Sequence, residues 1–358
     1  MKSLELIKEM TSVHGISGFE GEVKNLIKKH LKGKAEFSQD NLGSLICKKV
    51  GSQNAPKIMV PGHMDEIGFM VNSITKNGFI KFVPLGGWWD QVLLAQKVTI
   101  KTQKGDLEGI IGSIPPHLMS AKDKEKLVEK REMFIDVGAK DREEAQDILG
   151  IQPGDPIVPS ASFQVLRGTR MIMGKALDDR LGCCLFIDLI NQLQGTAHPN
   201  TVFGVGTVQE EVGLRGATTA ANVVEPDICL ALDVAIATDT PGLEKEDSEV
   251  KLGAGPVLTL ADASLIGNRS LRSFVIATAK ENNIPLQFNT MMGGGTDGGA
   301  VHKFGPGVPS VVISIPTRYI HTHYGLFYYD DYENTLNLLL AVVKKLDLET
   351  SERIKQGL

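Results

Sequence analysis

The spacing of apolar and charged residues predicts two helices and two strands in the first 60 residues. The N-terminal segment MKSLELIKEMTSVHG interleaves the two kinds of residue at helical spacing, and residues 18–31 carry an apolar face. Ser17 and Glu20 have the spacing of a capping box, which favours a second helix beginning here. Short apolar runs at 44–50 and 57–60 then predict strands.

The pattern changes between residues 72 and 162. Short β-like runs, GFIKFVPL, QKVTIKT and GIIGSIPP, are separated by glycine and proline, and one charged helical stretch, KDKEKLVEKREM, lies among them. We therefore expect residues 72–162 to form a small β-rich domain inserted into a main domain made of residues 1–71 and 163–358.

Longer elements return after residue 163. The predicted helices lie near 177–193, 270–282 and 333–346, and the predicted strands at 201–208, 227–234 and 310–315. Helices that alternate with strands apolar on both faces are typical of a mostly parallel sheet covered on both sides. The fold class is therefore α/β, with a mixed, mostly parallel sheet sandwiched by helices.

Composition narrows the class of protein. The 358 residues are 42% hydrophobic and 23% charged, as in ordinary globular proteins. A formal net charge of -5 argues against a general nucleic-acid binder. The N-terminus lacks the apolar core of a secretory signal, and no window approaches the ~18 apolar residues of a membrane span. Four cysteines without paired spacing are read as reduced, buried thiols, so we expect a cytoplasmic protein.

Residues that could bind metal lie at five places where an apolar strand or helix meets a loop. They are His63 and Asp65, Asp178 and Asp179, Glu210 and Glu211, Asp233, and His321 and His323. In an open α/β sheet such residues meet beyond the carboxyl ends of the strands. Two imidazoles and several carboxylates in one place need cations to balance their charge. Nitrogen and oxygen ligands suit zinc, cobalt or manganese, and a shared aspartate can bridge two ions about 3.5–4 Å apart.

Plainer interpretations exist for each of these features. A lone His-x-Asp is usually a hydrogen-bonded surface pair, and Asp178 with Asp179 could simply favour a helix dipole. The glycine-rich stretch at 291–300 lacks the Walker lysine, and we interpret it as a close backbone approach to a substrate or to the metal site. For Trp88 and Trp89 we favour packing or subunit contact.

Taken together, these segments resemble the glutamyl aminopeptidase and tetrahedral aminopeptidase (TET) family of dinuclear metallopeptidases. The resemblance runs almost end to end and is carried by SGFE at 17–20, GHMDEIGF at 62–69, IDVGAKDREEA at 135–145, PGDPIV at 153–158, KALDDR at 175–180, VQEEVGLRGA at 208–217, GGTDGGA at 294–300 and RYIHTH at 318–323. Many strings in the same order make the resemblance specific.

The resemblance implies a role for each residue of the site. It implies Glu210 as general base, Asp65 as the residue that orients a ligand, Asp178 as bridging ligand, and His63, Glu211, Asp233 and His321 as further ligands. His323 is the rival for the place of His321. Two divalent ions per subunit, zinc or cobalt or else manganese, would activate a bridging water that cleaves peptides at a free N-terminus. The inserted domain would be a PDZ-like barrel used for dimerisation and assembly into a homododecamer, with no nucleic-acid or membrane partner.

Substrate preference is the open part of this interpretation. Gly325 stands where many relatives have glutamate, which favours the glutamyl branch and hence N-terminal Glu or Asp. Arg318, Arg269 and Lys251 are candidates for recognising the acidic side chain. The alternatives are leucyl or broad specificity, a glycoside hydrolase, which would need two carboxylates but no metal, and an inactive peptide-binding scaffold.

Overall fold

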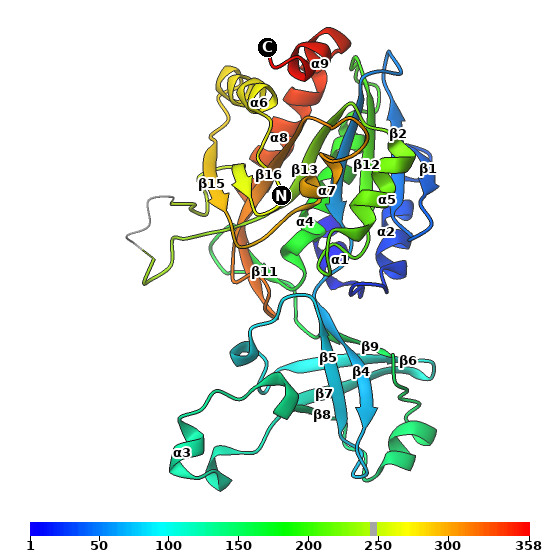
Figure 1. Ribbon diagram of the computed structural model, residues 1–358, viewed down its shortest axis with the longest axis vertical. Helices are drawn as coiled ribbons and strands as arrows, with labels where there is room; N and C mark the ends of the chain where they lie inside the picture. Colours follow the sequence, from blue (N-terminus) through cyan, green and yellow to red (C-terminus); the bar gives the residue numbers. More distant parts are fainter. Residues whose placement is uncertain (244–248) are drawn as a thin grey trace.

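The computed structural model describes residues 1–243 and 249–358 (Figure 1). The helices are α1 (Leu4–Ser12), α2 (Gly21–Leu31), α3 (Ala121–Lys124), α4 (Leu177–Gln192), α5 (Arg215–Val224), α6 (Arg269–Glu281), α7 (Asp297–Val301), α8 (Tyr329–Lys345) and α9 (Leu348–Lys355). The strands are β1 (Glu36–Gln39), β2 (Leu45–Val50), β3 (Lys57–His63), β4 (Gly68–Ile74), β5 (Ile80–Leu85), β6 (Lys97–Thr102), β7 (Gly105–Gly112), β8 (Phe134–Asp136), β9 (Pro156–Pro159), β10 (Gln164–Val165), β11 (Met171–Gly174), β12 (Thr201–Thr207), β13 (Ile228–Ile236), β14 (Val257–Asp262), β15 (Gln287–Met291), β16 (Ser310–Arg318) and β17 (Gly325–Tyr328). None of these helices combines the length and hydropathy that crossing a membrane requires.

The larger unit is a mixed sheet with strand order β1-β2-β12-β3-β13-β16-β17-β11-β10. Its centre, β12, β3, β13 and β16, is parallel, and antiparallel strands flank it on both sides. The prediction of a mixed α/β sheet between helices is confirmed. Parallel strands at the centre bring the carboxyl ends of several strands to one edge, and this edge faces the smaller unit (Figure 1).

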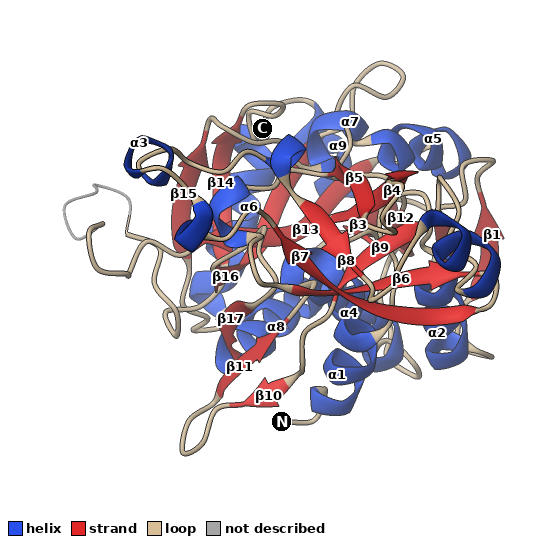
Figure 2. Ribbon diagram, turned by 90° about the horizontal axis from the view of Figure 1, so that it is seen from below, coloured by secondary structure: helices blue, strands red, loops and turns tan. Residues whose placement is uncertain are grey.

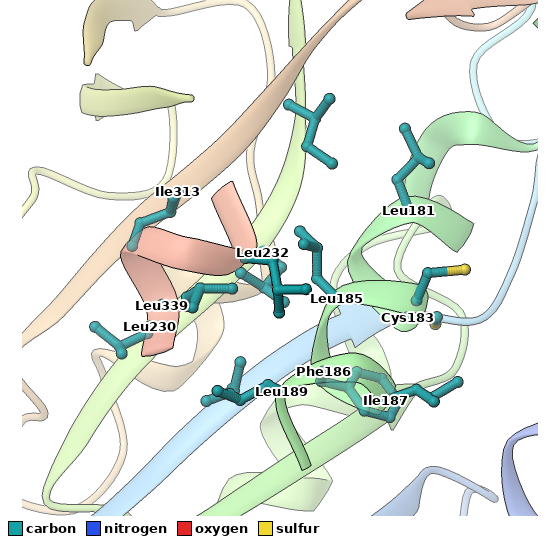
Figure 3. Packing of buried hydrophobic residues seen from close by; sticks show 14 of the residues in the cluster. Leu181, Cys183, Leu185, Phe186, Ile187, Leu189, Leu230, Leu232, Ile313 and Leu339 are labelled. Carbon is teal, nitrogen blue, oxygen red and sulfur yellow. The ribbon is translucent and has the colours of Figure 1, made fainter. Parts of the chain in front are cut away.

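Alternate residues along the central strands pack into two cores, one on each face of the sheet. Leu230 and Leu232 of β13 lie in the larger core with α4 and α8, where Figure 3 shows them beside Leu185 and Leu339. Their neighbours along the strand lie in the second core, which contains alanines of α5 and Val301 of α7. Each fully buried leucine contributes about 1.5–3 kcal/mol, so both faces hold helices firmly and keep the strand ends in place.

The smaller unit is a closed barrel with strand order β4-β5-β8-β7-β6-β9, which confirms the expected barrel (Figure 2). It has its own apolar core, including Phe69, Trp88 and Ile100. The barrel strands run from Gly68 to Pro159. The exact division of the chain at 71/72 and 162/163, and a role in assembly, stay predictions.

Two local predictions are wrong. The charged stretch 122–133 is α-helical only at its start, within α3, because its residues up to 127 are exposed and no apolar face anchors a longer helix. The capping box does not form either. The N-cap of α2 is Glu20, without a side-chain capping bond, and the Ser17 hydroxyl instead donates to Asp65 at 2.6 Å.

Candidate metal centre

The histidines and carboxylates singled out from the sequence converge at the carboxyl edge of the parallel strands. His63 is the last residue of β3, and Asp233 lies near the end of β13. The Glu210–Glu211 pair follows β12, and His321 follows β16. Asp178 reaches the same place from the first turn of α4. The sheet topology thus gathers residues that are far apart in the chain.

Asp178 lies between the two imidazoles. Its Oδ1 is 3.0 Å from His63 Nε2, and its Oδ2 is 3.4 Å from His321 Nε2. His321 Nε2 is also 3.4 Å from Glu211 Oε2, and His63 Nε2 is 3.8 Å from Glu210 Oε2. One carboxylate therefore faces both histidines, as a bridging ligand must.

Two overlapping sets of side chains among the described residues have ligand atoms within 4.8 Å of one another. They are His63 with Glu210 and Asp233, and His63 with Asp178 and Glu211. Both sets offer nitrogen and oxygen donors without thiolates, which suits zinc, cobalt or manganese. In addition, Glu211 Oε1 is buried and has no hydrogen-bond partner among the described residues. A buried carboxylate oxygen without a donor is well suited to a cation, so the residues fit a metal centre.

Hydrogen bonds fix which nitrogen of each imidazole faces the cluster. His63 Nδ1 lies 2.9 Å from the main-chain carbonyl of Asp65, and His321 Nδ1 lies 2.8 Å from the carbonyl of Gly87. A carbonyl only accepts, so Nδ1 carries the proton in both rings. Nε2 is then the atom that faces Asp178, and it would supply its lone pair to a cation that takes the place of its proton.

Asp65 organises the backbone of the neighbouring loop. Its Oδ1 accepts from the amide of Glu210 at 3.0 Å, and its Oδ2 accepts from the amide of Glu211 at 3.2 Å and from Ser17. Its carboxylate is 3.6 Å from His63 Nδ1, so the main-chain carbonyl, at 2.9 Å, makes the closer contact with that ring. Burial opposes ionisation of Asp65, but these hydrogen bonds and His63 lower its pKa.

The carboxylates of the cluster repel one another. Burial and the nearby charge of Asp178 raise the pKa of Glu211 to about 8. Burial, Asp233 and Asp297 raise the pKa of Glu210 well above its ordinary value. Burial also opposes ionisation of Asp178, but contacts with both histidines lower its pKa. A site with this surplus of buried acid holds protons or cations.

Three residues beside the cluster adopt left-handed backbone conformations. Ala176 has φ +51°, Gln209 has φ +55°, and His321 has φ +56°. Such conformations are unfavourable for residues other than glycine and persist where surrounding contacts enforce them. Each lies at the point where the chain turns a functional side chain, Asp178, Glu210 or His321, into the site.

The structure separates the paired candidates. Asp179 accepts from the amides of His63 and Gly182 and thereby holds the start of α4, whereas Asp178 faces the cluster. His323 is buried beside Trp88, with ring centroids 5.3 Å apart, and burial lowers its pKa to about 4. The packing interpretation fits Trp88, which stacks on Phe69, while Trp89 is 66% exposed.

Sequence reasoning missed a buried ion cluster next to the site. Lys175 Nζ lies 2.6 Å and 2.8 Å from the two carboxylate oxygens of Glu66, and Arg180 Nη2 lies 3.4 Å from one of them. Arg180 also donates to the carbonyls of Met10, Val13, Gly15 and Met64. The signal in the sequence was that GHMDE and KALDDR carry further charged residues within three positions of a proposed ligand.

The glycine-rich stretch serves packing. A Cβ at Gly299 would lie 1.8 Å from the Ser264 hydroxyl oxygen, so α7 packs directly on the loop after β14. Asp297 of this stretch is buried and accepts from the Thr207 hydroxyl at 2.5 Å. The close approach expected here is therefore to the protein's own chain.

A pocket opens beside the cluster. It is lined by Glu66, Lys175, Asp178, Glu211, His321 and apolar residues including Ile67, Leu177 and Ile320. Among the described residues of this lining, Lys175 is the one lysine or arginine, and it is already paired with Glu66. Arg318 pairs with Asp239, and Lys251 pairs with Glu249. Neither Arg318, Lys251 nor Arg269 is among the described residues that line the pocket.

Comparisons with known proteins agree with this arrangement. The family model described as M42 glutamyl aminopeptidase matches residues 43–338. The lysyl aminopeptidase of Pyrococcus furiosus is 37% identical over 97% of this chain and 98% of its own. The TET aminopeptidase of a marine sediment Thaumarchaeota archaeon is 48% identical, with a TM-score of 0.96 over 99% of both chains. The TET1 peptidase of Pyrococcus horikoshii, which can assemble into a tetrahedron or a large octahedral shell, is 34% identical, with a TM-score of 0.86 over 96% of this chain and 99% of its own.

Proposed function

From the premise that the chain belongs to the M42 glutamyl aminopeptidase family and is an aminopeptidase, we propose that it cleaves the first peptide bond of short peptides at a two-metal centre. The observation that carries this proposal is the position of Asp178, with one carboxylate oxygen toward each histidine.

The ligands divide into two groups around Asp178. His63 and Asp233 would hold one cation together with Asp178. Glu211 and His321 would hold the other, since His321 Nε2 lies 3.4 Å from both Glu211 Oε2 and Asp178 Oδ2. When bound, the cations would lower the pKa of a water and polarise the scissile carbonyl.

Glu210 is the proposed general base. It is 8% exposed, its carboxylate reaches within 3.8 Å of His63, and burial raises its pKa well above the ordinary value. A carboxylate with raised basicity can take the proton of the attacking water and return it to the leaving amine. The amide of Glu210, held by Asp65, fixes the base relative to the ligands.

We further propose a preference for N-terminal Glu or Asp. Its support is the family's description and the ammonium of Lys175 in the pocket. Glu66 already neutralises this ammonium, so recognition would require a substrate carboxylate to share Lys175 with Glu66. The lysyl preference in the name of the Pyrococcus furiosus relative is the alternative to be tested.

The experiment is release of p-nitroaniline from Glu-, Leu- and Lys-anilides, before and after chelation and after zinc or cobalt is added back. Glu210→Gln is assayed beside Glu225→Gln, an exposed glutamate remote from the cluster. We expect activity to need metal and to fall at least ~10²-fold in Glu210→Gln only. Activity on the anilides that survives chelation would contradict the metal centre, and faster turnover of Leu- or Lys-anilide would contradict the acidic preference.

We also propose that the chain works in the cytoplasm as a large homo-oligomer. The four cysteines are free and buried, which suits a reducing compartment. The likeness to the TET1 peptidase supports assembly of dimers into a dodecamer through the barrel. Light scattering should then give a mass of twelve chains of 38.7 kDa, and a monomer would exclude this assembly.

A further inference from the structure

A loop of the barrel reaches the metal cluster. It comprises residues 86–89, after β5, and its Gly87 carbonyl accepts the Nδ1 proton of His321 at 2.8 Å. The preceding glycine passes close to a second proposed ligand, since a Cβ at Gly86 would lie 3.4 Å from Cβ of Glu211. Part of the surroundings of the metal cluster therefore comes from the inserted unit.

Trp88, the residue after Gly87 in this loop, makes a second contact with the segment that contains His321 and His323. Trp88 is buried, donates from Nε1 to the carbonyl of Gly68 at 3.1 Å, and stacks on Phe69 with centroids 4.7 Å apart and planes at 22°. Its ring also lies 5.3 Å from the ring of His323. Trp88 thus joins the barrel core to the segment that carries His321.

That segment needs outside support. Tyr319 and His321 have φ of +60° and +56°, in the left-handed region that residues with a side chain rarely adopt. Such residues keep their conformation only where neighbouring contacts enforce it. The contacts of the barrel loop act at His321 itself and at His323, two residues further on.

We propose that Gly87 and Trp88 are positioning residues, a barrel clamp that holds His321 with Nε2 toward Asp178 and Glu211. The Gly87 carbonyl sets the tautomer and the ring orientation, and Trp88 anchors the loop that carries this carbonyl. The inference rests on the proposed metal centre. It gives the barrel a part in binding one of the two cations, the one held by Glu211 and His321.

Gly87 allows a narrow test of the clamp. A Cβ at this position would lie 3.1 Å from His321 Nδ1 and 3.4 Å from Cε1, which forces the ring to shift by a few tenths of an ångström. The backbone of Gly87 does not have a positive φ, so alanine fits its conformation. Gly21→Ala is the matched control, because a Cβ there meets nothing within 4 Å.

The experiment titrates cobalt into metal-free full-length protein, followed by calorimetry and by visible absorption of bound cobalt. For the unaltered protein we expect two equivalents. In Gly87→Ala we expect one equivalent to bind about 10–100-fold more weakly, the usual effect of losing an outer-shell partner, and the other to be unchanged. Gly21→Ala should bind both equivalents of cobalt as tightly as the unaltered protein does.

The tryptophans give a second test. Trp88→Ala should weaken the same equivalent, whereas Trp88→Phe, which keeps a ring against Phe69, should restore most of the affinity. The adjacent Trp89→Ala serves as control, since that side chain is 66% exposed. If Trp88→Ala does not fold, Gly87→Ala decides the question.

The possible failures are distinguishable. If the unaltered protein binds no cobalt, the proposed metal centre is wrong, and the clamp with it. If the unaltered protein binds two equivalents and Gly87→Ala binds both equally well, the clamp alone is wrong. Equal weakening of both equivalents in Gly87→Ala would also overturn it, because a clamp on His321 acts on one site.

Discussion

Asp65 shows how much one buried side chain can organise around it. Its carboxylate accepts from two consecutive amides and a hydroxyl, while its own carbonyl accepts from His63. It accepts from the amides of the proposed base and of a proposed ligand, so we expect any effect of Asp65 on the reaction to pass through these residues.

Asp65→Asn should therefore lower kcat by about 10–100-fold. In asparagine one of the two carboxylate oxygens becomes an NH2 group, which donates and cannot accept. This NH2 group would face the amides of Glu210 and Glu211 or the Ser17 hydroxyl, where Asp65 has an acceptor. We expect KM to change little and the melting temperature to fall modestly, as measured by anilide kinetics and thermal denaturation. Ser17→Ala, which removes one donor, should have a smaller effect, and a larger effect in Ser17→Ala would contradict this account.

At the residue scale, the sequence pattern predicted which side chains lie close together and left two choices open. Its pattern of polar residues after apolar runs led to the five groups that the structure brings together. The pattern alone could not choose Asp178 over Asp179 or His321 over His323, because side-chain direction there depends on left-handed turns and on contacts with the barrel. Only the family resemblance favoured Asp178 and His321. The sequence did not predict the cluster of Glu66, Lys175 and Arg180, because buried ion pairs have no characteristic residue spacing along the chain.

That ion cluster ties elements together at the scale of the fold. Arg180, in the first turns of α4, binds carbonyls at the end of α1 and in the loop after it, and Glu66 stands between Arg180 and Lys175. The Glu66 carboxylate thus forms ion pairs with two buried cations, Lys175 and Arg180. Removing the anion leaves two unpaired charges, whereas removing Lys175 leaves a balanced pair.

We therefore expect Glu66→Gln to destabilise the protein by about 3–5 kcal/mol, and Lys175→Met to cost less. Chemical denaturation followed by far-UV circular dichroism compares the two variants. If Lys175→Met were the more destabilising variant, the account of one anion balancing two buried cations would be wrong.

A second buried carboxylate makes stability depend on pH. Asp331, in the first turn of α8, accepts from the amides of Gly253 and Gly255 at 2.7 Å and 2.8 Å. Burial, helped by Asp330 and Asp239, nevertheless raises its pKa from 3.8 to about 6. The folded state therefore holds this proton more tightly than the unfolded state does.

The stabilisation from this proton is fully present below pH about 4 and is lost as the pH rises to about 6. At about 1.4 kcal/mol per unit of pKa, the loss is about 3 kcal/mol at most. Asp331→Asn has no such proton, so its unfolding free energy relative to the unaltered protein should improve between pH 4 and pH 7. Urea denaturation of both proteins measures this, and a pH-independent difference would contradict it.

The elements themselves followed well from the sequence. The helix predicted at 177–193 is α4 at Leu177–Gln192, and the strand predicted at 310–315 lies within β16. Long, strongly apolar segments are specified by their own periodicity. The stretch at 122–133 was misjudged because charge spacing alone does not supply a buried face, and most of its residues are exposed.

At the scale of the whole molecule, the barrel carries exposed apolar side chains. Ile114, Leu118 and Leu127 are 62%, 79% and 69% exposed in the segment that contains α3. Large exposed apolar residues close together mark interaction sites, and the proposed oligomer would cover them.

Leu118→Glu combined with Leu127→Glu should therefore reduce the mass found by light scattering, because a buried charge in the contact is costly. The circular dichroism spectrum should stay unchanged, since neither side chain packs in a core. An unaltered mass would place the contacts of the oligomer elsewhere on the molecule.

The position of the barrel in the chain also sets the order in which the barrel and the proposed ligands are synthesised. Of the proposed ligands, His63 alone precedes the barrel, while Asp178, Glu210–Glu211, Asp233 and His321 follow it. The barrel is one contiguous segment, and such units fold during synthesis, those nearest the N-terminus first. At about 5–20 residues per second, the ribosome reaches His321 some 10–50 s after it begins the barrel. The carbonyl of Gly87 is then already in place when its histidine partner leaves the ribosome.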